Sequence, residues 1–202
     1  MNPERLCGSE INTEDIRCRL EAYSGPALSL PPERTFRAAS ILIALACDED
    51  EWNLLFTRRT EHLQNHKGQV SFPGGSAEPQ DENRAATALR ETYEEVGIPP
   101  EDIEVLGSLW EMPTITGFLI TPVIGRIPWP VDLRLAPEEV SKAFLVPLRW
   151  LADLDNHEEV PLNLPDGRHE KVIYFSPFQG EKIWGATARI TLNFLRAIDW
   201  IE

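Results

Sequence analysis

A glycine-rich turn that runs directly into an acidic helix constrains this chain more than any other feature. The segment covers residues 68–98, GQVSFPGGSAEPQDENRAATALRETYEEVGI. Pro73, Gly74 and Gly75 predict a tight turn whose backbone can approach a ligand without side-chain obstruction. We therefore expect a loop built for close contact, followed at once by a helix rich in carboxylates.

The helix is predicted to have two different faces. Because each residue of a helix advances the chain by about 100°, residues of one kind can gather on one side. The small and apolar face, suited to lying close on a sheet, contains Ala85, Ala88, Leu89, Thr92 and Val96. Glu91, Glu94 and Glu95 share another face, which we expect to point away from the core.

Two interpretations of these three glutamates differ in their consequences. They are either an ordinary solvated face or a site for hard cations, which bind carboxylates together with substrate phosphate oxygens. Like charges three and four residues apart repel by about a few tenths of a kcal/mol per pair. Arg90 compensates only part of this repulsion, so the arrangement without a cation is mildly unfavourable. The glycine turn before the helix favours the cation site.

The net charge of −14 restricts the partners of the chain. A nucleic-acid backbone or an anionic membrane surface would be repelled at long range, so neither is expected as a partner. Three cysteines without CxxC spacing indicate neither a disulfide framework nor a zinc ribbon. No signal peptide or bilayer-spanning apolar run is found, and a cytoplasmic location is expected.

The order of apolar patterns predicts a single α+β domain with helices packed on a sheet. Residues 12–23 predict an amphipathic helix, and a proline-containing linker follows it. Strand-like runs occupy 39–47, which we expect to be buried on both faces, 52–59, and parts of 103–110, 117–127, 142–152 and 169–175. A closing helix is predicted over 185–198. We expect residues 38–202 to form the main domain and residues 1–37 to pack on it or on a second subunit of a homodimer.

The run from Gly75 to Ile98 resembles the Nudix box, whose usual form is G-x5-E-x7-R-E-U-x-E-E-x-G-U, with U a bulky apolar residue. The matching residues are Gly75, Glu82, Arg90, Glu91, Glu94, Glu95, Gly97 and Ile98. The chain departs from the pattern twice: six residues separate Gly75 from Glu82, and Thr92 stands at the first apolar position.

The resemblance extends to one branch of this superfamily. Residues 55–75, LFTRRTEHLQNHKGQVSFPGG, are similar to the motif that precedes the box in coenzyme A pyrophosphatases, including Thr57, Gly68 and the FPGG ending. Residues 116–125, 139–148 and 183–190 are similar to that branch as well. Gln64 stands where the motif usually has an arginine.

The resemblance implies a Nudix fold, an α/β/α sandwich around a mixed β-sheet, and metal-dependent attack of water on a diphosphate. It implies Mg²⁺ or Mn²⁺ held by Glu91 and Glu95 first and Glu94 next, with the Gly75 carbonyl as a further ligand. Glu82 is expected to form an ion pair with Arg90 or a water-mediated metal contact. The general base stays open among the glutamates, and Glu139 is a candidate outside the box.

Substrate contacts are expected from the loop and from a strand end. Gly74, Gly75 and Gln64 belong to the motif, and Arg58 and Arg59 are either phosphate contacts or exposed strand-end charges. The implied reaction converts coenzyme A to 3′,5′-ADP and 4′-phosphopantetheine. The alternatives are hydrolysis of another nucleoside diphosphate derivative, such as ADP-ribose, an NDP-sugar or an oxidised nucleotide, and a catalytically silent binding module. No metal role is expected for His62 or His66, and His157 and His169 are expected in surface loops.

Overall fold

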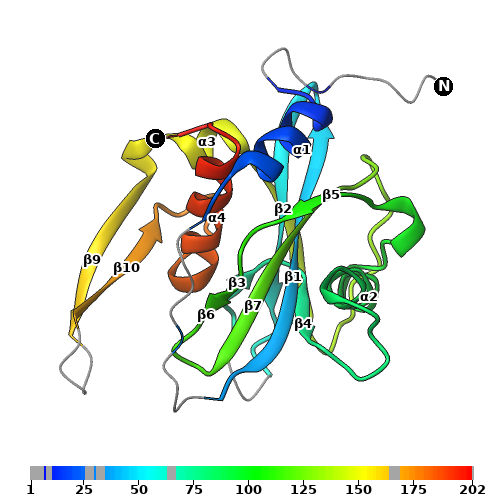
Figure 1. The fold of residues 1–202 in the computed structure, drawn as a ribbon, viewed down its shortest axis with the longest axis horizontal. Coiled ribbons are helices and arrows are strands. Elements are labelled where there is room, and N and C mark those ends of the chain that lie inside the picture. Colours follow the sequence, from blue (N-terminus) through cyan, green and yellow to red (C-terminus); the bar gives the residue numbers. More distant parts are fainter. Residues whose placement is uncertain are drawn as a thin grey trace.

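The computed structural model describes residues 7, 11–25, 30, 35–62, 67–163 and 169–201, without the side chains of residues 163, 169 and 170. Its centre is a mixed sheet in the order β3-β2-β1-β7-β5, with β4 on β1, β6 on β7 and β8 on β2 (Figure 1). The strands are β1 (Arg37–Asp48), β2 (Glu51–Arg59), β3 (Val70–Ser71), β4 (Gly74–Ser76), β5 (Glu104–Ser108), β6 (Met112–Pro113), β7 (Phe118–Arg126) and β8 (Val140–Pro147). A separate hairpin pairs β9 (His157–Asn163) with β10 (His169–Phe175).

The helices lie on both faces of the sheet, as an α/β/α sandwich requires (Figure 1). They are α1 (Thr13–Ala22), α2 (Arg84–Val96), α3 (Leu148–Ala152) and α4 (Gly185–Ala197), with short turns η1 (Pro100–Asp102) and η2 (Leu154–Asn156). Helix α2 covers one face alone, and α1, α3 and α4 cover the other. The predicted α+β class and the mixed sheet are confirmed.

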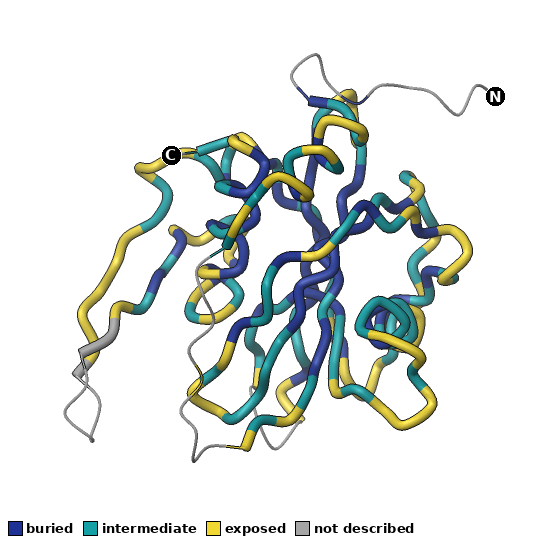
Figure 2. The backbone as a smooth tube through the Cα atoms, in the orientation of Figure 1, coloured by how far each residue is buried: buried dark blue, intermediate teal, exposed yellow. Residues whose placement is uncertain are grey.

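Strand β1 forms the middle of both cores. It runs parallel to β7 and antiparallel to β2 and β4. Because side chains alternate along a strand, Leu42 and Ala44 pack under α2, whereas Ile43 and Leu45 pack on the α4 side. Both faces are buried, as its continuous apolar run predicted (Figure 2).

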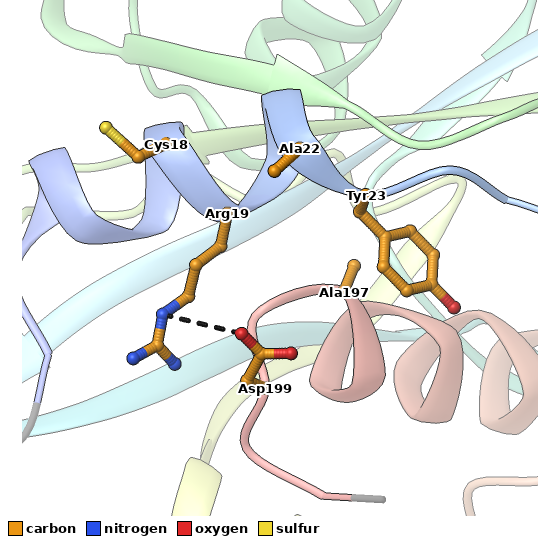
Figure 3. A pocket seen from close by; sticks show the side chains of 6 residues that line it. All are labelled: Cys18, Arg19, Ala22, Tyr23, Ala197 and Asp199. Carbon is orange, nitrogen blue, oxygen red and sulfur yellow. Dashed lines mark ion pairs between the residues drawn. The ribbon is translucent and has the colours of Figure 1, made fainter.

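Helix α1 packs on the main domain. Asn12 caps it by accepting from the Asp15 backbone, and Ile16 and Leu20 are buried in the α4-side core. A small pocket lies between helix α1 and the C-terminal end of helix α4 (Figure 3). The pocket is lined by Cys18, Arg19, Ala22, Tyr23, Ala197 and Asp199, and Arg19 pairs with Asp199 at 3.9 Å. None of the helices in the described part of the chain is long and apolar enough to span a bilayer.

Two expectations for single residues were wrong. Cys7 and Cys47, 40 residues apart, form a disulfide with Cα atoms 5.5 Å apart, and Cys18 is free. The pairing depends on how the N-terminal segment folds against the end of β1, which cysteine spacing does not reveal. His157 begins β9 with its ring 5.4 Å from that of Phe175, so it is a partly buried strand residue and does not lie in a surface loop. His169 begins β10, and its side chain lies outside the described residues.

Candidate active site

Helix α2 is capped at both ends. The Asn83 side chain accepts from the Ala86 backbone at 2.9 Å, and Gly97 ends the helix in the left-handed region at φ 76°. Its sheet-facing side buries Thr87, Ala88 and Thr92. The Thr92 hydroxyl donates to the Ala88 carbonyl at 2.7 Å, which satisfies this polar group inside the core.

The three glutamates of α2 do not share one exposed face. The Glu94 side chain is 56% exposed, that of Glu91 is 15% exposed and that of Glu95 is 3% exposed. The expectation that all three point away from the core is therefore wrong for Glu95. The reason is tertiary: the segment before β8 binds the end of α2, where the Ala136 backbone donates to the Glu95 carbonyl at 2.9 Å.

Glu95 occupies an unusual environment for a carboxylate. It accepts a backbone hydrogen bond from Gly74 and lies 3.8 Å from Arg59, while its second oxygen, Oε2, is buried without a hydrogen-bond partner in the described part of the chain. Burial raises its pKa to about 8, opposed by the charge of Arg59 and reinforced by the charges of Glu139 and Glu91. An under-compensated buried acid of this kind marks a functional site more often than a structural one.

Glu91 lies against the glycine turn. A Cβ atom added to Gly75 would stand 2.4 Å from a Glu91 carboxylate oxygen, so only glycine permits this approach. At Gly74, where φ is 149°, a Cβ would stand 2.4 Å from the Ser40 carbonyl. Burial raises the pKa of Glu91, and the neighbouring Arg90 opposes that rise. The turn therefore lies directly against the Glu91 carboxylate, and the predicted approach of its backbone to a ligand stays a prediction.

Arg90 joins the turn to the helix. Its guanidinium donates to Asp81 at 3.0 and 3.1 Å, to the Ser76 carbonyl at 3.0 Å, to Glu91 at 3.1 Å and to Glu94 at 3.0 Å. The hydrogen bonds from Arg90 hold the pKa of Asp81 far below its usual value, and those to Asp81 raise the pKa of Arg90.

The expected ion pair between Glu82 and Arg90 is wrong, because Asp81 takes that place and Glu82 is exposed. Asp81 is nearly buried and also accepts from the Thr87 hydroxyl at 2.9 Å and from the Glu78 backbone at 2.8 Å. The sequence contained a signal for this role of Asp81. Five residues separate Gly75 from Asp81, which is the usual spacing of the box, so the extra residue follows the acid.

Glu139, far from the box in the sequence, is brought to the same place. It is exposed, and its charge raises the pKa of both Glu91 and Glu95. Its carbonyl accepts from the Thr60 backbone at 2.9 Å, which ties the start of β8 to the end of β2. The structure thus brings Glu139 near enough to Glu91 and Glu95 for its charge to act on both carboxyl groups.

The two consecutive arginines of β2 separate. Arg59 reaches Glu95 on the α2 side, whereas Arg58 contacts Glu61 at 2.8 Å and Glu181 at 3.8 Å. Glu181 precedes α4, so the two guanidinium groups lie on different faces of the sheet. Gln64 and His66 lie outside the described residues.

The donor set suits a hard divalent cation. Among the residues that the structure describes, no three His, Cys, Asp or Glu side chains converge closely enough to hold a metal as they stand, and Arg90 engages Glu91 and Glu94. The buried Oε2 atom of Glu95 nevertheless has no hydrogen-bond partner in the described part of the chain, and burial raises the pKa of Glu91 although Arg90 contacts it. Carboxylate oxygens are the ligands that Mg²⁺ and Mn²⁺ prefer.

Comparisons with known proteins agree with this geometry. Residues 35–167 match the family model of the NUDIX domain. The "Uncharacterized Nudix hydrolase NudL" of Photorhabdus laumondii is 40% identical over 163 residues, which cover 79% of this chain and 86% of that protein. The protein of the same name from Yersinia pestis is 38% identical over 164 residues, 81% of each chain. A MutT/nudix family protein from Enterococcus faecalis superposes with a TM-score of 0.53 at 17% identity, over 94% of this chain and 75% of that one, which shows the fold alone.

Proposed function

Because the chain belongs to the Nudix hydrolase family, we propose that it hydrolyses the diphosphate linkage of coenzyme A or its derivatives, giving 3′,5′-ADP and 4′-phosphopantetheine. Nudix hydrolases generally use divalent metal ions such as Mg²⁺, and the proposed cofactor is Mg²⁺ or Mn²⁺. One observation carries the proposal: Glu95 of the box contacts both Arg59 and Gly74, which belong to the upstream motif of the coenzyme A branch. These contacts support a single site that includes the motif and the carboxylates.

Glu91 and Glu95 are the proposed principal metal ligands, with Glu94 and the Gly75 carbonyl as further ones. The unpartnered Glu95 oxygen supports this assignment, because a buried carboxylate without a partner is costly unless it is paired or binds a metal. Glu94 is exposed and bound to Arg90, so it would have to exchange this partner to join the site. Glu82 is exposed, and a water-mediated contact is the only metal role that suits it.

A bound divalent ion would neutralise the diphosphate and make water more acidic. The residues of the chain would then position the substrate and accept a proton. Arg59 supplies a cation beside Glu95 for a substrate phosphate, and the Gly74–Gly75 backbone permits its close approach. Arg90 fixes Glu91 relative to the turn.

Glu139 is the proposed general base, in preference to the glutamates of α2. A general base has to be accessible to water and must not be fully engaged as a ligand. Glu139 is exposed and close enough to Glu91 and Glu95 to perturb the pKa of both, whereas Glu91 and Glu94 are bound to Arg90.

The second candidate function is hydrolysis of another nucleoside diphosphate derivative, such as ADP-ribose, an NDP-sugar or an oxidised nucleotide. Gln64, in place of the usual arginine of the motif, is the observation that favours it. A silent binding module would be expected to lose carboxylates of the box, and this chain retains Glu82, Glu91, Glu94 and Glu95.

A substrate panel tests the proposal. The purified protein with Mg²⁺ or Mn²⁺ is expected to release 3′,5′-ADP from coenzyme A faster than it cleaves ADP-ribose, an NDP-sugar or an oxidised nucleotide. Cleavage of ADP-ribose with coenzyme A left intact would overturn the substrate and keep the reaction class. If no compound of the panel is hydrolysed with metal present, the binding module becomes the better explanation.

A further inference from the structure

A second group of charged residues lies on the opposite face of the sheet from the candidate metal site. Arg58 of β2 and Lys142 of β8 are direct cross-strand neighbours. Their side chains are 39% and 40% exposed, so both are accessible to solvent. Both contact the same carboxylate: Glu181 lies 3.0 Å from Lys142 Nζ and 3.8 Å from Arg58 Nε.

Glu181 is built to hold these two cations in place. It is buried, and a tight turn fixes its backbone, since Phe178 and Glu181 exchange two backbone hydrogen bonds of 2.9 Å. The Phe178 ring packs on that of Trp150 at 4.9 Å, which anchors the turn. Lys142 Nζ also lies 5.1 Å from the centre of the Phe144 ring. One buried carboxylate therefore orders two accessible cations and neutralises only one of their charges.

The remaining charge is balanced by a weak partner. Glu61 accepts from Arg58 at 2.8 Å, but its side chain is 64% exposed and it is only three residues away in the chain. Exposed pairs of this kind contribute little to stability. A phosphate monoester, with more charge and three acceptor oxygens, matches the guanidinium fork better than a carboxylate does. Glu61 thus occupies the position at which a phosphate would bind.

The location connects this group to the candidate active site. Arg58 and Arg59 are consecutive, and Arg59 contacts Glu95 on the α2 side. A substrate whose diphosphate lies beside Glu95 would have to place a second phosphate around the end of β2 to contact Arg58. In a chain with a net charge of −14, an accessible pair of cations provides a local positive charge that favours such an anion.

We propose that Arg58 and Lys142 form a subsite for a phosphomonoester on the nucleoside half of the substrate, with Glu181 as the residue that positions them. The inference rests on the proposed function and deepens it. The 3′-phosphate of coenzyme A is such a group, whereas ADP-ribose and NDP-sugars carry none. The subsite would thus select coenzyme A among nucleoside diphosphate derivatives.

Calorimetric titration with two small nucleotides tests the subsite without turnover. Adenosine 3′,5′-bisphosphate is expected to bind about tenfold more tightly than adenosine 5′-monophosphate, because only the former reaches Arg58 and Lys142. Arg58→Met and Lys142→Met should each remove this difference and leave the binding of the monophosphate unchanged. Equal affinities in the unmodified protein, or an equal loss for both nucleotides in the variants, would overturn the subsite.

Matched controls separate a local effect from loss of a surface charge. Arg149 pairs with Glu51 at 2.6 Å and Lys171 with Glu159 at 2.6 Å, and all four lie outside the subsite. Arg149→Met and Lys171→Met should preserve the preference for the bisphosphate. If either control abolishes the preference, the overall charge of the surface explains it and the subsite is wrong.

A variant that should bind more tightly is a useful control, because poor folding cannot explain a gain of affinity. Glu61→Gln removes the exposed competitor and leaves Glu181 with both cations, so it should bind adenosine 3′,5′-bisphosphate several-fold more tightly. Unchanged or weaker binding would contradict the role of Glu61 as the displaced group.

Kinetics distinguish failure of the subsite from failure of the proposed function. The KM for coenzyme A should rise about tenfold in Arg58→Met, whereas its kcat should stay unchanged. The KM for the same compound without its 3′-phosphate should also stay unchanged. Turnover of both compounds with equal KM in the unmodified protein would overturn the subsite and keep the function. Preference for the bisphosphate without any turnover of coenzyme A would support the subsite and reject the function.

Discussion

Helices α2 and α4 have the same length, 13 residues, and pack on opposite faces of one sheet, yet they bury different chemistry. Helix α4 buries Ile190, Leu192, Phe194 and Leu195. Helix α2 buries two threonines and a glutamate, Thr87, Thr92 and Glu95, with only Ala88 and Val96 as apolar partners. Apolar burial stabilises the first interface, whereas the second contains a carboxylate that burial disfavours.

This difference indicates that the two faces of the sheet have different roles. The α4 side supplies the larger core, and it can hold the sheet together without help from the site. On the α2 side, burial of the Glu95 carboxylate lowers stability, and this arrangement brings the acidic side chains next to the backbone of the glycine turn. Four tests, in order of decreasing effect, examine this division.

The largest effect is expected from Phe194→Ala on α4. Phe194 is fully buried, and loss of a buried phenylalanine costs about 3–5 kcal/mol of the free energy of unfolding. Urea denaturation measures the loss. Well below the transition, kcat should hold within about twofold, since the residue lies on the far side of the sheet. A kcat that falls as far as that of a metal-ligand variant would contradict the division between the helices.

Glu95→Gln on α2 should have the opposite effect, with turnover lost and stability kept. Turnover should fall by about 100-fold or more, because even residues behind metal ligands contribute 10 to 100-fold. The metal-free variant should nevertheless melt at a higher temperature than the original protein at pH 8 to 9, since the buried charge is removed. Addition of Mn²⁺ should raise the melting temperature of the original protein and not that of the variant. Near-normal turnover would remove Glu95 from the ligand role.

Asp81→Asn and Glu82→Gln form a matched pair at adjacent positions. Asp81 accepts two hydrogen bonds from Arg90, so its loss should cost about 1–3 kcal/mol of unfolding free energy and lower turnover by about tenfold or more. Glu82 is exposed, and its substitution should change stability by less than about 0.5 kcal/mol. Thermal melts and kinetics measure both. Greater damage from Glu82→Gln would restore Glu82 as the partner that the usual box assigns to Arg90.

The smallest effect, taken over a single pH unit, is the dependence of metal-free stability on pH. The pKa of Glu95 is raised to about 8, so its favourable contribution is full below its ordinary value of 4.5 and is lost as pH rises through 8, by up to about 1.4 kcal/mol per pH unit. The pKa of Asp81 is lowered, so its contribution is present above its ordinary value of 3.8 and is lost as pH falls below it. Stability should decline on both sides. Denaturation at a series of pH values should lose the alkaline decline in Glu95→Gln and keep it in Asp81→Asn.

Much of the fold could be predicted because its signals are local. Helix α1, strands β1 and β2, and helices α2 and α4 follow from caps and from apolar periodicity within single segments. Of the hairpin, strand β10 was predicted and β9 was not. Strand β9 contains Glu158, Glu159 and Pro161, which do not indicate a strand. Its pairing with β10 is a contact between segments, which periodicity does not encode.

The candidate site was predictable in its residues and not in their environment. The spacing of the box identifies Glu91, Glu94 and Glu95, because their type and interval are properties of the chain. Their burial is not: the segment that reaches Glu95 through Ala136 decides that one glutamate is enclosed while Glu94 stays in solvent. The same holds for Cys7 and Cys47, which only folding brings together.

The sequence by itself determined the family, the acidic helix and the glycine turn that precedes it. Only the tertiary structure decided that Asp81 rather than Glu82 holds Arg90, that Glu139 lies near Glu95, and that Arg58 and Arg59 lie on opposite faces. The physical reason is that charge and spacing are set along the chain. Burial, pKa and partners depend on which distant segments exclude water from a group.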